Sequence, residues 1–179
     1  RDWSTAVCIA SGPSLTATDA DAVRAWRDRT GHGVIVTNNT YQLAPWADVL
    51  YGMDSKWWDV MRPVFEGERL SGVDHAPTAR KAESPKGGNS GAGALFLAAH
   101  RGAKRVILLG YDGKAGEDGA RHWHGSHCEG LKDADSMKHF YSQMKDATAR
   151  LSTTEIINCS RSTAYALWPR MDLEEALQH

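Results

Sequence analysis

Histidines gather in one short stretch of the chain, residues 121–128, which reads Arg-His-Trp-His-Gly-Ser-His-Cys. An unperturbed imidazole has a pKa of about 6.5, so a histidine here could take a proton from a hydroxyl group at neutral pH. We predict that one histidine of this stretch is such a general base, with His124 and His127 among the candidates. Asp112 is the third candidate catalytic residue, although a carboxylate in its position is as often the anchor of a loop N–H.

The same stretch offers zinc as an alternative, because His122, His124, His127 and Cys128 all carry ligand atoms. Their spacing fits no standard zinc pattern, and one short loop rarely supplies a whole coordination shell. A further alternative is a polar loop whose histidines only bond their neighbours. We therefore predict chemistry without a metal and without a resident cofactor, and keep zinc as the competing hypothesis.

The strands and helices that must position these groups alternate along the chain. Apolar runs predict strands over 6–10, 33–37, 48–52, 104–110 and 155–159, with a short one over 68–71. Helices are expected over 20–29, 57–61, 92–100, 134–150 and 173–177, the first capped by Thr16 or Thr18. This alternation predicts an α/β fold: one three-layer, Rossmann-like domain over residues 1–179, with a mostly parallel sheet and helices on both faces. Residues 73–88 are predicted as a surface loop, either a lid or a nucleic-acid contact.

In an open parallel sheet, a ligand lies beyond the carboxyl ends of the strands. The turn Ser11-Gly12-Pro13-Ser14 follows the first strand and precedes a helix, a combination that can direct backbone N–H groups at an anion. Gly12 is expected to leave room for a phosphate, so that Gly12→Val would abolish binding at only modest cost in stability. Polar residues after the other strands complete the set of predicted nucleotide- and donor-binding residues: Ser11, Gly12, Pro13, Ser14, Asn38, Asn39, Asp54, Ser90, Gly91, Tyr111, Ser160 and Thr163.

The composition is that of an ordinary globular protein, with 41% apolar and 24% charged residues. Lys and Arg number 21 against 22 Asp and Glu, so the bulk charge indicates no polyanionic partner. Cys8 and Cys159 lie in apolar runs and no CxxC pair is present, which is typical of a reducing compartment. No apolar run approaches the roughly 20 residues of a membrane span. We expect a cytoplasmic protein without membrane contact, and its oligomeric state, including a homo-oligomer, stays open.

Four short motifs resemble those of a known family. They are Ser11-Gly-Pro-Ser-Leu15, Thr37-Asn-Asn39, Asn89-Ser-Gly91 and Val106-Ile-Leu-Leu-Gly-Tyr-Asp112. In this order they are similar to motifs of the bacterial family-42 sialyltransferases, of their phage and bacterial relatives of unknown function and, more distantly, of the archaeal hydroxymethylpterin diphosphokinase. The resemblance extends from residue 6 to about residue 177, as short motifs rather than continuous identity.

The resemblance implies a cytidine nucleotide whose phosphate and ribose contact the Ser11–Ser14 turn. It also implies that Asn38 binds the nucleotide, that Ser90 and Gly91 lie at the phosphate, and that His127 or His124 is the base. The family's loop asparagine is Ser11 here, which changes the donor group offered at that point.

These observations together predict a glycosyltransferase-like enzyme that uses a CMP- or UDP-type sugar donor, a histidine base and no metal. The expected acceptor is a hydroxyl group of a glycan or of a hydroxymethylated DNA base, in a bacterium or a phage-infected host cell. The alternatives are a diphosphokinase-type transferase acting on a pterin-like alcohol and a non-catalytic nucleotide-sensing module. Against the diphosphokinase, the chain has no G-x-x-x-x-G-K-[ST] loop and no obvious acidic cluster for Mg²⁺.

Overall fold

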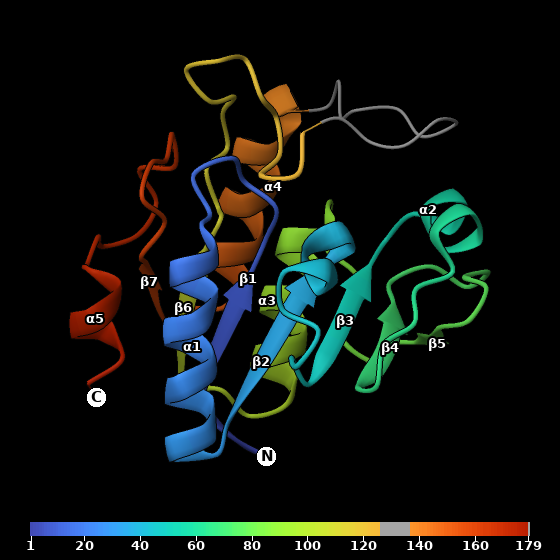
Figure 1. The fold of residues 1–179 in the computed structure, drawn as a ribbon, viewed down its shortest axis with the longest axis horizontal. Coiled ribbons are helices and arrows are strands. Elements are labelled where there is room, and N and C mark those ends of the chain that lie inside the picture. Colours follow the sequence, from blue (N-terminus) through green and yellow to red (C-terminus); the bar gives the residue numbers. More distant parts are fainter. Residues whose placement is uncertain (126–136, 179) are drawn as a thin grey trace.

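A single parallel sheet of seven strands forms the centre of the computed structural model, which describes residues 1–125 and 137–178 (Figure 1). The strands are β1 (Asp2–Ile9), β2 (His32–Thr37), β3 (Val49–Gly52), β4 (Glu68–Ser71), β5 (Arg80–Lys81), β6 (Arg105–Leu109) and β7 (Glu155–Asn158). Their order across the sheet is β5-β4-β3-β2-β1-β6-β7, and every neighbouring pair is parallel. The α/β, Rossmann-like fold predicted from the sequence is confirmed.

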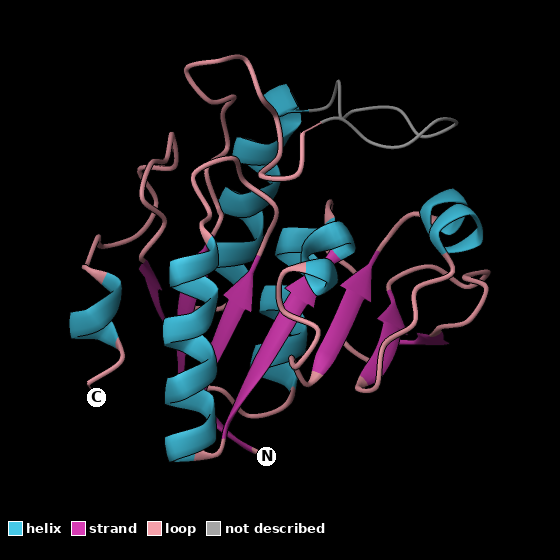
Figure 2. Cartoon of the chain, viewed as in Figure 1, coloured by secondary structure: helices cyan, strands magenta, loops and turns pink. Residues whose placement is uncertain are grey.

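Helices cover both faces of the sheet (Figure 2). They are α1 (Ala17–Thr30), the 3-10 helix η1 (Asn38–Gln42), α2 (Ser55–Met61), α3 (Ser90–His100), α4 (Met137–Arg150) and α5 (Leu173–Ala176). The central strand β1 is apolar on both sides, because its alternate side chains enter two different cores. Ala6 and Cys8 pack in the core that contains α3 and α4, whereas Val7 and Ile9 pack in the core that contains α1.

The order in which strands are added to the sheet changes direction at β1. From β1 it runs outward through β2, β3, β4 and β5, and α3 then returns it to β6 on the other side of β1. Strand order therefore switches between β1 and β6, and the helices that follow these two strands, α1 and α4, pack in the two different cores. Ligands of open α/β sheets bind in the crevice that such a switch creates at the carboxyl edge.

Several element boundaries differ from those expected, among them the start of β1, which lies four residues earlier, at Asp2. Helix α1 begins three residues earlier, because Thr16 is its N-cap: the Thr16 hydroxyl accepts a hydrogen bond from Asp19 N at 3.2 Å, and the Asp19 carboxylate accepts one from Thr16 N. The segment 73–88, expected to be loop throughout, contains β5, which pairs with β4. Both residues of this two-residue edge strand, Arg80 and Lys81, are charged and exposed, which disfavours pairing with another chain. None of the described helices is both long and apolar enough to cross a membrane.

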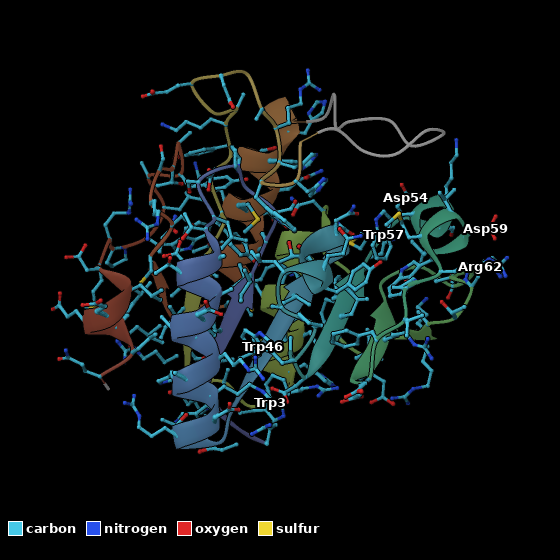
Figure 3. The ribbon with its side chains drawn as sticks, in the orientation of Figure 1. Trp3, Trp46, Asp54, Trp57, Asp59 and Arg62 are labelled. Carbon is cyan, nitrogen blue, oxygen red and sulfur yellow. The ribbon has the colours of Figure 1, made fainter. Side chains whose placement is uncertain are left out.

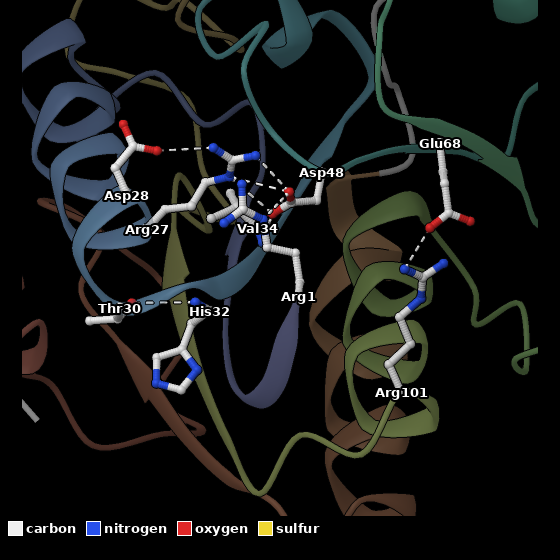
Figure 4. Close-up of polar contacts among 9 residues, drawn as sticks. All are labelled: Arg1, Arg27, Asp28, Thr30, His32, Val34, Asp48, Glu68 and Arg101. Carbon is white, nitrogen blue, oxygen red and sulfur yellow. Dashed lines mark hydrogen bonds and ion pairs between the residues drawn. The ribbon is translucent and has the colours of Figure 1, made fainter.

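Asp48 joins three elements at the amino edge of the sheet (Figure 4). Its carboxylate accepts hydrogen bonds from Arg27 Nη2 in α1 at 2.7 Å, from Val34 N in β2 at 2.9 Å and from Arg1 Nε at 2.7 Å. Burial raises the pKa of Asp48, but the hydrogen bonds from Arg27, Val34 and Arg1 outweigh it and hold the pKa below the usual aspartate value. The charged form is therefore the one that the fold stabilises.

We expect Asp48→Asn to lower the free energy of unfolding by roughly 2 kcal/mol at neutral pH, because Arg27 and Arg1 lose a carboxylate in a half-buried position. The folded-state pKa is depressed, so this contribution is present above the unfolded value of about 3.9 and is lost as the pH falls through the folded value. Urea denaturation of both proteins at pH 7 and at pH values near 3 measures the difference.

The control is Asp59→Asn, which removes an exposed ion pair with Arg62 on α2 and should change stability little (Figure 3). A loss at Asp48 that is no larger than this control, or that persists unchanged in acid, would contradict the role given to the cluster.

Candidate functional site

A cavity of about 570 Å³ opens at the carboxyl edge of the sheet. The turns after β1 and β6 line it together with the end of β2, the start of α3, one side of α4 and the loop that follows β6. Nine of the predicted site residues are in its lining: Ser11, Gly12, Pro13, Asn38, Asp54, Ser90, Gly91, Tyr111 and Asp112. Of the others, Ser14, Asn39, His124, Ser160 and Thr163 are not among the lining residues, and His127 lies outside the described residues.

The turns after β1 and β6 meet backbone to backbone. Gly12 N donates a hydrogen bond to Gly110 O at 2.8 Å, and a Cβ added at Gly12 would meet that same oxygen and the carboxylate of Asp112. Gly110 itself has φ +69°, a conformation that glycine adopts without strain. The side of Gly12 expected to admit a phosphate is thus filled by the protein, and the glycine is needed for the contact between the two turns.

Most donors of the first turn bond to the protein itself. Ser14 N donates to Asp112 Oδ2 and Ser14 Oγ to Asp112 Oδ1, both at 2.8 Å, while Leu15 N donates to Gly12 O at 3.1 Å. Asp112 is 3% exposed; burial raises its pKa, and the two hydrogen bonds from Ser14 oppose that rise. Of the two roles foreseen for Asp112, its contacts are those of a loop anchor.

Three further predicted binding residues form hydrogen bonds that hold the lining in place. Ser160 Oγ accepts from Tyr111 N at 2.8 Å, and Thr163 Oγ1 donates to Tyr111 O at 2.7 Å, so the main chain of Tyr111 is fixed on both sides. Asn39 Oδ1 accepts from the indole N–H of Trp57 at 2.6 Å. Trp57 and Asp54 both line the cavity near the start of α2 (Figure 3).

The start of α3 faces the cavity, with Gly88, Asn89, Ser90 and Gly91 in the lining. Asn89 caps the helix by accepting a hydrogen bond from Ala92 N at 2.9 Å, and its amide group donates to Gln143 on α4. Ser90 Oγ accepts from Met53 N at 3.2 Å and donates to Asn38 at 3.4 Å, which ties the helix to the ends of β2 and β3. The positive end of the helix dipole is therefore directed at the cavity.

Residues 121–125, the described part of the histidine-rich stretch, contact the first turn. Trp123 N donates to Ser11 O at 3.1 Å, and the Trp123 indole N–H donates to Thr40 Oγ1 at 3.3 Å. These contacts bring His122 Nδ1 to 3.2 Å from Ser11 Oγ and place His122 in the lining, with the His124 ring stacked on it at a centroid distance of 4.9 Å. Lys114 and Arg121, from the same loop, add two cations to the lining.

Of the two described histidines of this stretch, His122 lines the cavity and His124 does not, whereas His127, the base favoured by the sequence, lies outside the described residues. All the histidines of the stretch lie within seven residues of one another, so spacing alone could not separate them. His122 contacts Ser11, which lies 111 residues away in the sequence, and a local sequence pattern cannot predict such a contact. Within the described ranges 1–125 and 137–178, no three His, Cys, Asp or Glu side chains are grouped to hold a metal ion.

Comparisons with known proteins give no relative for this chain: no family model, no curated protein and no solved structure matches it.

We expect Gly12→Ala to lower the free energy of unfolding by about 1–3 kcal/mol, because its Cβ would press on Gly110 O and Asp112 and force the two turns apart. This replaces the modest cost foreseen from the sequence. The matched control is Gly88→Ala, because the three atoms nearest to its added Cβ all belong to the side chain of Gln143 and not to the main chain. Thermal and urea denaturation of both variants measure the effect; equal stability would contradict the close contact of the turns.

Proposed function

We propose that the cavity binds a nucleotide-activated sugar and that the protein is a glycosyltransferase acting at the carboxyl edge of the sheet. One observation carries the proposal: a cavity at the strand-order switch combines the N-terminus of α3 with Lys114, Arg121 and His122. The helix N-terminus and the two cations are suited to the phosphate groups of a donor, and the histidine is suited to the deprotonation of an acceptor.

The phosphate groups of the donor would lie between the start of α3 and the cations of the loop after β6. A helix N-terminus attracts anions through its dipole and its unbonded N–H groups, and Lys114 and Arg121 supply full positive charges from the facing loop. The same groups would stabilise the charge that develops on the departing phosphate. Since most donors of the first turn are bonded within the protein, this part of the proposal rests on α3 rather than on α1.

The nucleoside would extend toward β2 and α2. Asn38 offers an amide group there, and it lies beside Asp54 and Trp57 in the lining. An amide is both a donor and an acceptor, which suits a base edge or a ribose hydroxyl group. Cytidine and uridine nucleotides are the candidates that the sequence motifs favour.

His122 would act as the general base. In that role it takes a proton from an attacking hydroxyl group while the bond between the anomeric carbon and the phosphate oxygen breaks. The acceptor remains the hydroxyl group of a glycan or of a hydroxymethylated DNA base, and we propose that transfer needs no metal. A cytoplasmic setting and the diphosphokinase and sensor alternatives also stay as hypotheses.

We expect CMP, CDP, UMP or UDP to raise the melting temperature, because ligand binding to the folded state alone stabilises it. A ligand at 100 times its dissociation constant adds about 2.7 kcal/mol. A thermal-shift screen at millimolar concentrations measures this, with inorganic phosphate as the control for simple anion binding. If no nucleotide exceeds phosphate, the donor site is refuted.

We expect His122→Ala to retain the melting temperature and nucleotide affinity while losing at least about 10²-fold in turnover, the usual cost of a missing general base. Transfer from the donor found in the screen is measured with and without a chelator. His100→Ala, which removes a half-exposed histidine at the other end of α3, is the control.

A comparable loss in His127→Ala, with His122→Ala active, would return the base to the sequence-favoured residue. Loss of wild-type activity on chelation would support the zinc alternative. Nucleotide binding without any transfer in the wild-type protein would support the sensor.

A further inference from the structure

A serine and a histidine meet inside the cavity. Ser11 Oγ lies 3.2 Å from His122 Nδ1, and both residues are in the lining. A nucleophile and its activating base are recognised by contact within about 2.6–3.2 Å. Neither residue was assigned to such a pair by the sequence, which treated Ser11 as a ligand-binding residue.

The surrounding contacts fix the relative position of the two side chains. Trp123, the residue after His122, forms two of these contacts. Its main-chain N–H donates to Ser11 O at 3.1 Å, and its indole N–H donates to Thr40 Oγ1 at 3.3 Å. Thr40 Oγ1 in turn donates to Ala10 O, the residue before Ser11, at 3.3 Å. The loop and the turn are therefore joined on both sides of the Ser11–His122 contact.

The orientation of the imidazole selects which hydroxyl group it can deprotonate. His122 Nε2 is buried, whereas Nδ1 is the ring nitrogen that contacts Ser11 Oγ. A proton taken by Nδ1 comes from the serine hydroxyl unless a ligand displaces that group. The hydroxyl group nearest to the base thus belongs to the protein.

We propose that Ser11 is a nucleophile activated by His122, and that it attacks the phosphorus of a diphosphate bound in this cavity. The proposal rests on the nucleotide site proposed above and adds a second activity, phosphoryl transfer through a phosphoserine. Phosphorus is the electrophile because the cavity presents Lys114, Arg121 and the start of α3 to an anionic group.

In the first step His122 Nδ1 takes the proton of Ser11 Oγ as the Oγ–P bond forms at the terminal phosphorus of a nucleoside diphosphate. The bond from phosphorus to the bridging oxygen breaks, its electron pair stays on that oxygen, and the nucleoside monophosphate leaves. In the second step water attacks phosphorus, the P–Oγ bond breaks and Oγ recovers the proton from the imidazolium. Inorganic phosphate is released, and the remaining proton of the attacking water passes to solvent.

The experiment uses diisopropyl fluorophosphate, whose phosphorus reacts with activated serines by forming an Oγ–P bond and releasing fluoride. Intact-mass and peptide mass spectrometry follow the extent and the position of labelling. We expect one adduct on Ser11, none in Ser11→Ala, and a labelling rate at least about 10²-fold lower in His122→Gln. The control is Ser142→Ala, since the exposed Ser142 hydroxyl donates to the main-chain oxygen of His139 and not to an imidazole; its labelling should equal that of the wild type.

The variants are compared only at temperatures where circular dichroism shows them folded. Labelling elsewhere, no labelling, or labelling of Ser11 that is unchanged in His122→Gln would overturn the proposal. A second arm adds CMP or UMP at millimolar concentration, which should slow labelling at Ser11. If neither nucleotide stabilises the protein but Ser11 is labelled through His122, the donor site fails and the nucleophile stands. If a nucleotide binds and Ser11 stays unlabelled, the nucleophile fails and the donor site stands.

Discussion

The close approach of two main-chain segments, the turns after β1 and β6, is the constraint on which the rest of the site depends. Gly12 N bonds to Gly110 O, and no side chain fits between the turns after β1 and β6. With the turns in contact, Asp112 can accept both donors of Ser14, and Ser160 and Thr163 can hold Tyr111 from the next strand. The bidentate contact of Arg161 with Asp19 then fastens the same segment to the start of α1. These hydrogen bonds hold the turns after β1 and β6 together, and residues of both turns line the cavity.

The fold was predictable because its signals are local. Unbroken apolar runs such as 106–109 identify doubly buried strands, and Thr16 and Asn89 are capping residues at helix starts. The order of the strands was not predicted, because it depends on the side of the sheet to which each connection returns the chain. The two-residue strand β5 was missed because Arg80 and Lys81 carry no apolar pattern; their pairing with β4 comes from the position of the neighbouring strand.

The sequence allowed the position of the candidate site in the fold to be predicted. It was less informative about the role of each residue there. Polar residues after strands do gather at one edge, yet a polar side chain there can face a ligand or hold the loop that does. Ser14 and Ser160 hold loops, Ser11 lines the cavity, and Ser90 does both, although all four are serines at strand ends or a helix start. The choice depends on which long-range partner each one meets. His122 illustrates the same limit, because its partner Ser11 is separated from it by 111 positions.

The loop after β6 has a consequence for how this scaffold can change. Lys114, Arg121 and His122 all follow β6 and precede α4, so the cations and the imidazole of the cavity come from one continuous stretch of sequence. The hydrogen bonds that hold the turn after β6 to the turn after β1 and to Ser160 involve Gly110, Tyr111 and Asp112, which precede Lys114 in this stretch. Replacement of residues 114–122 alone would therefore change the cations and this histidine while leaving the strands and Gly110 in place. In the laboratory, such a replacement would separate the contribution of these side chains to ligand binding from that of the fold.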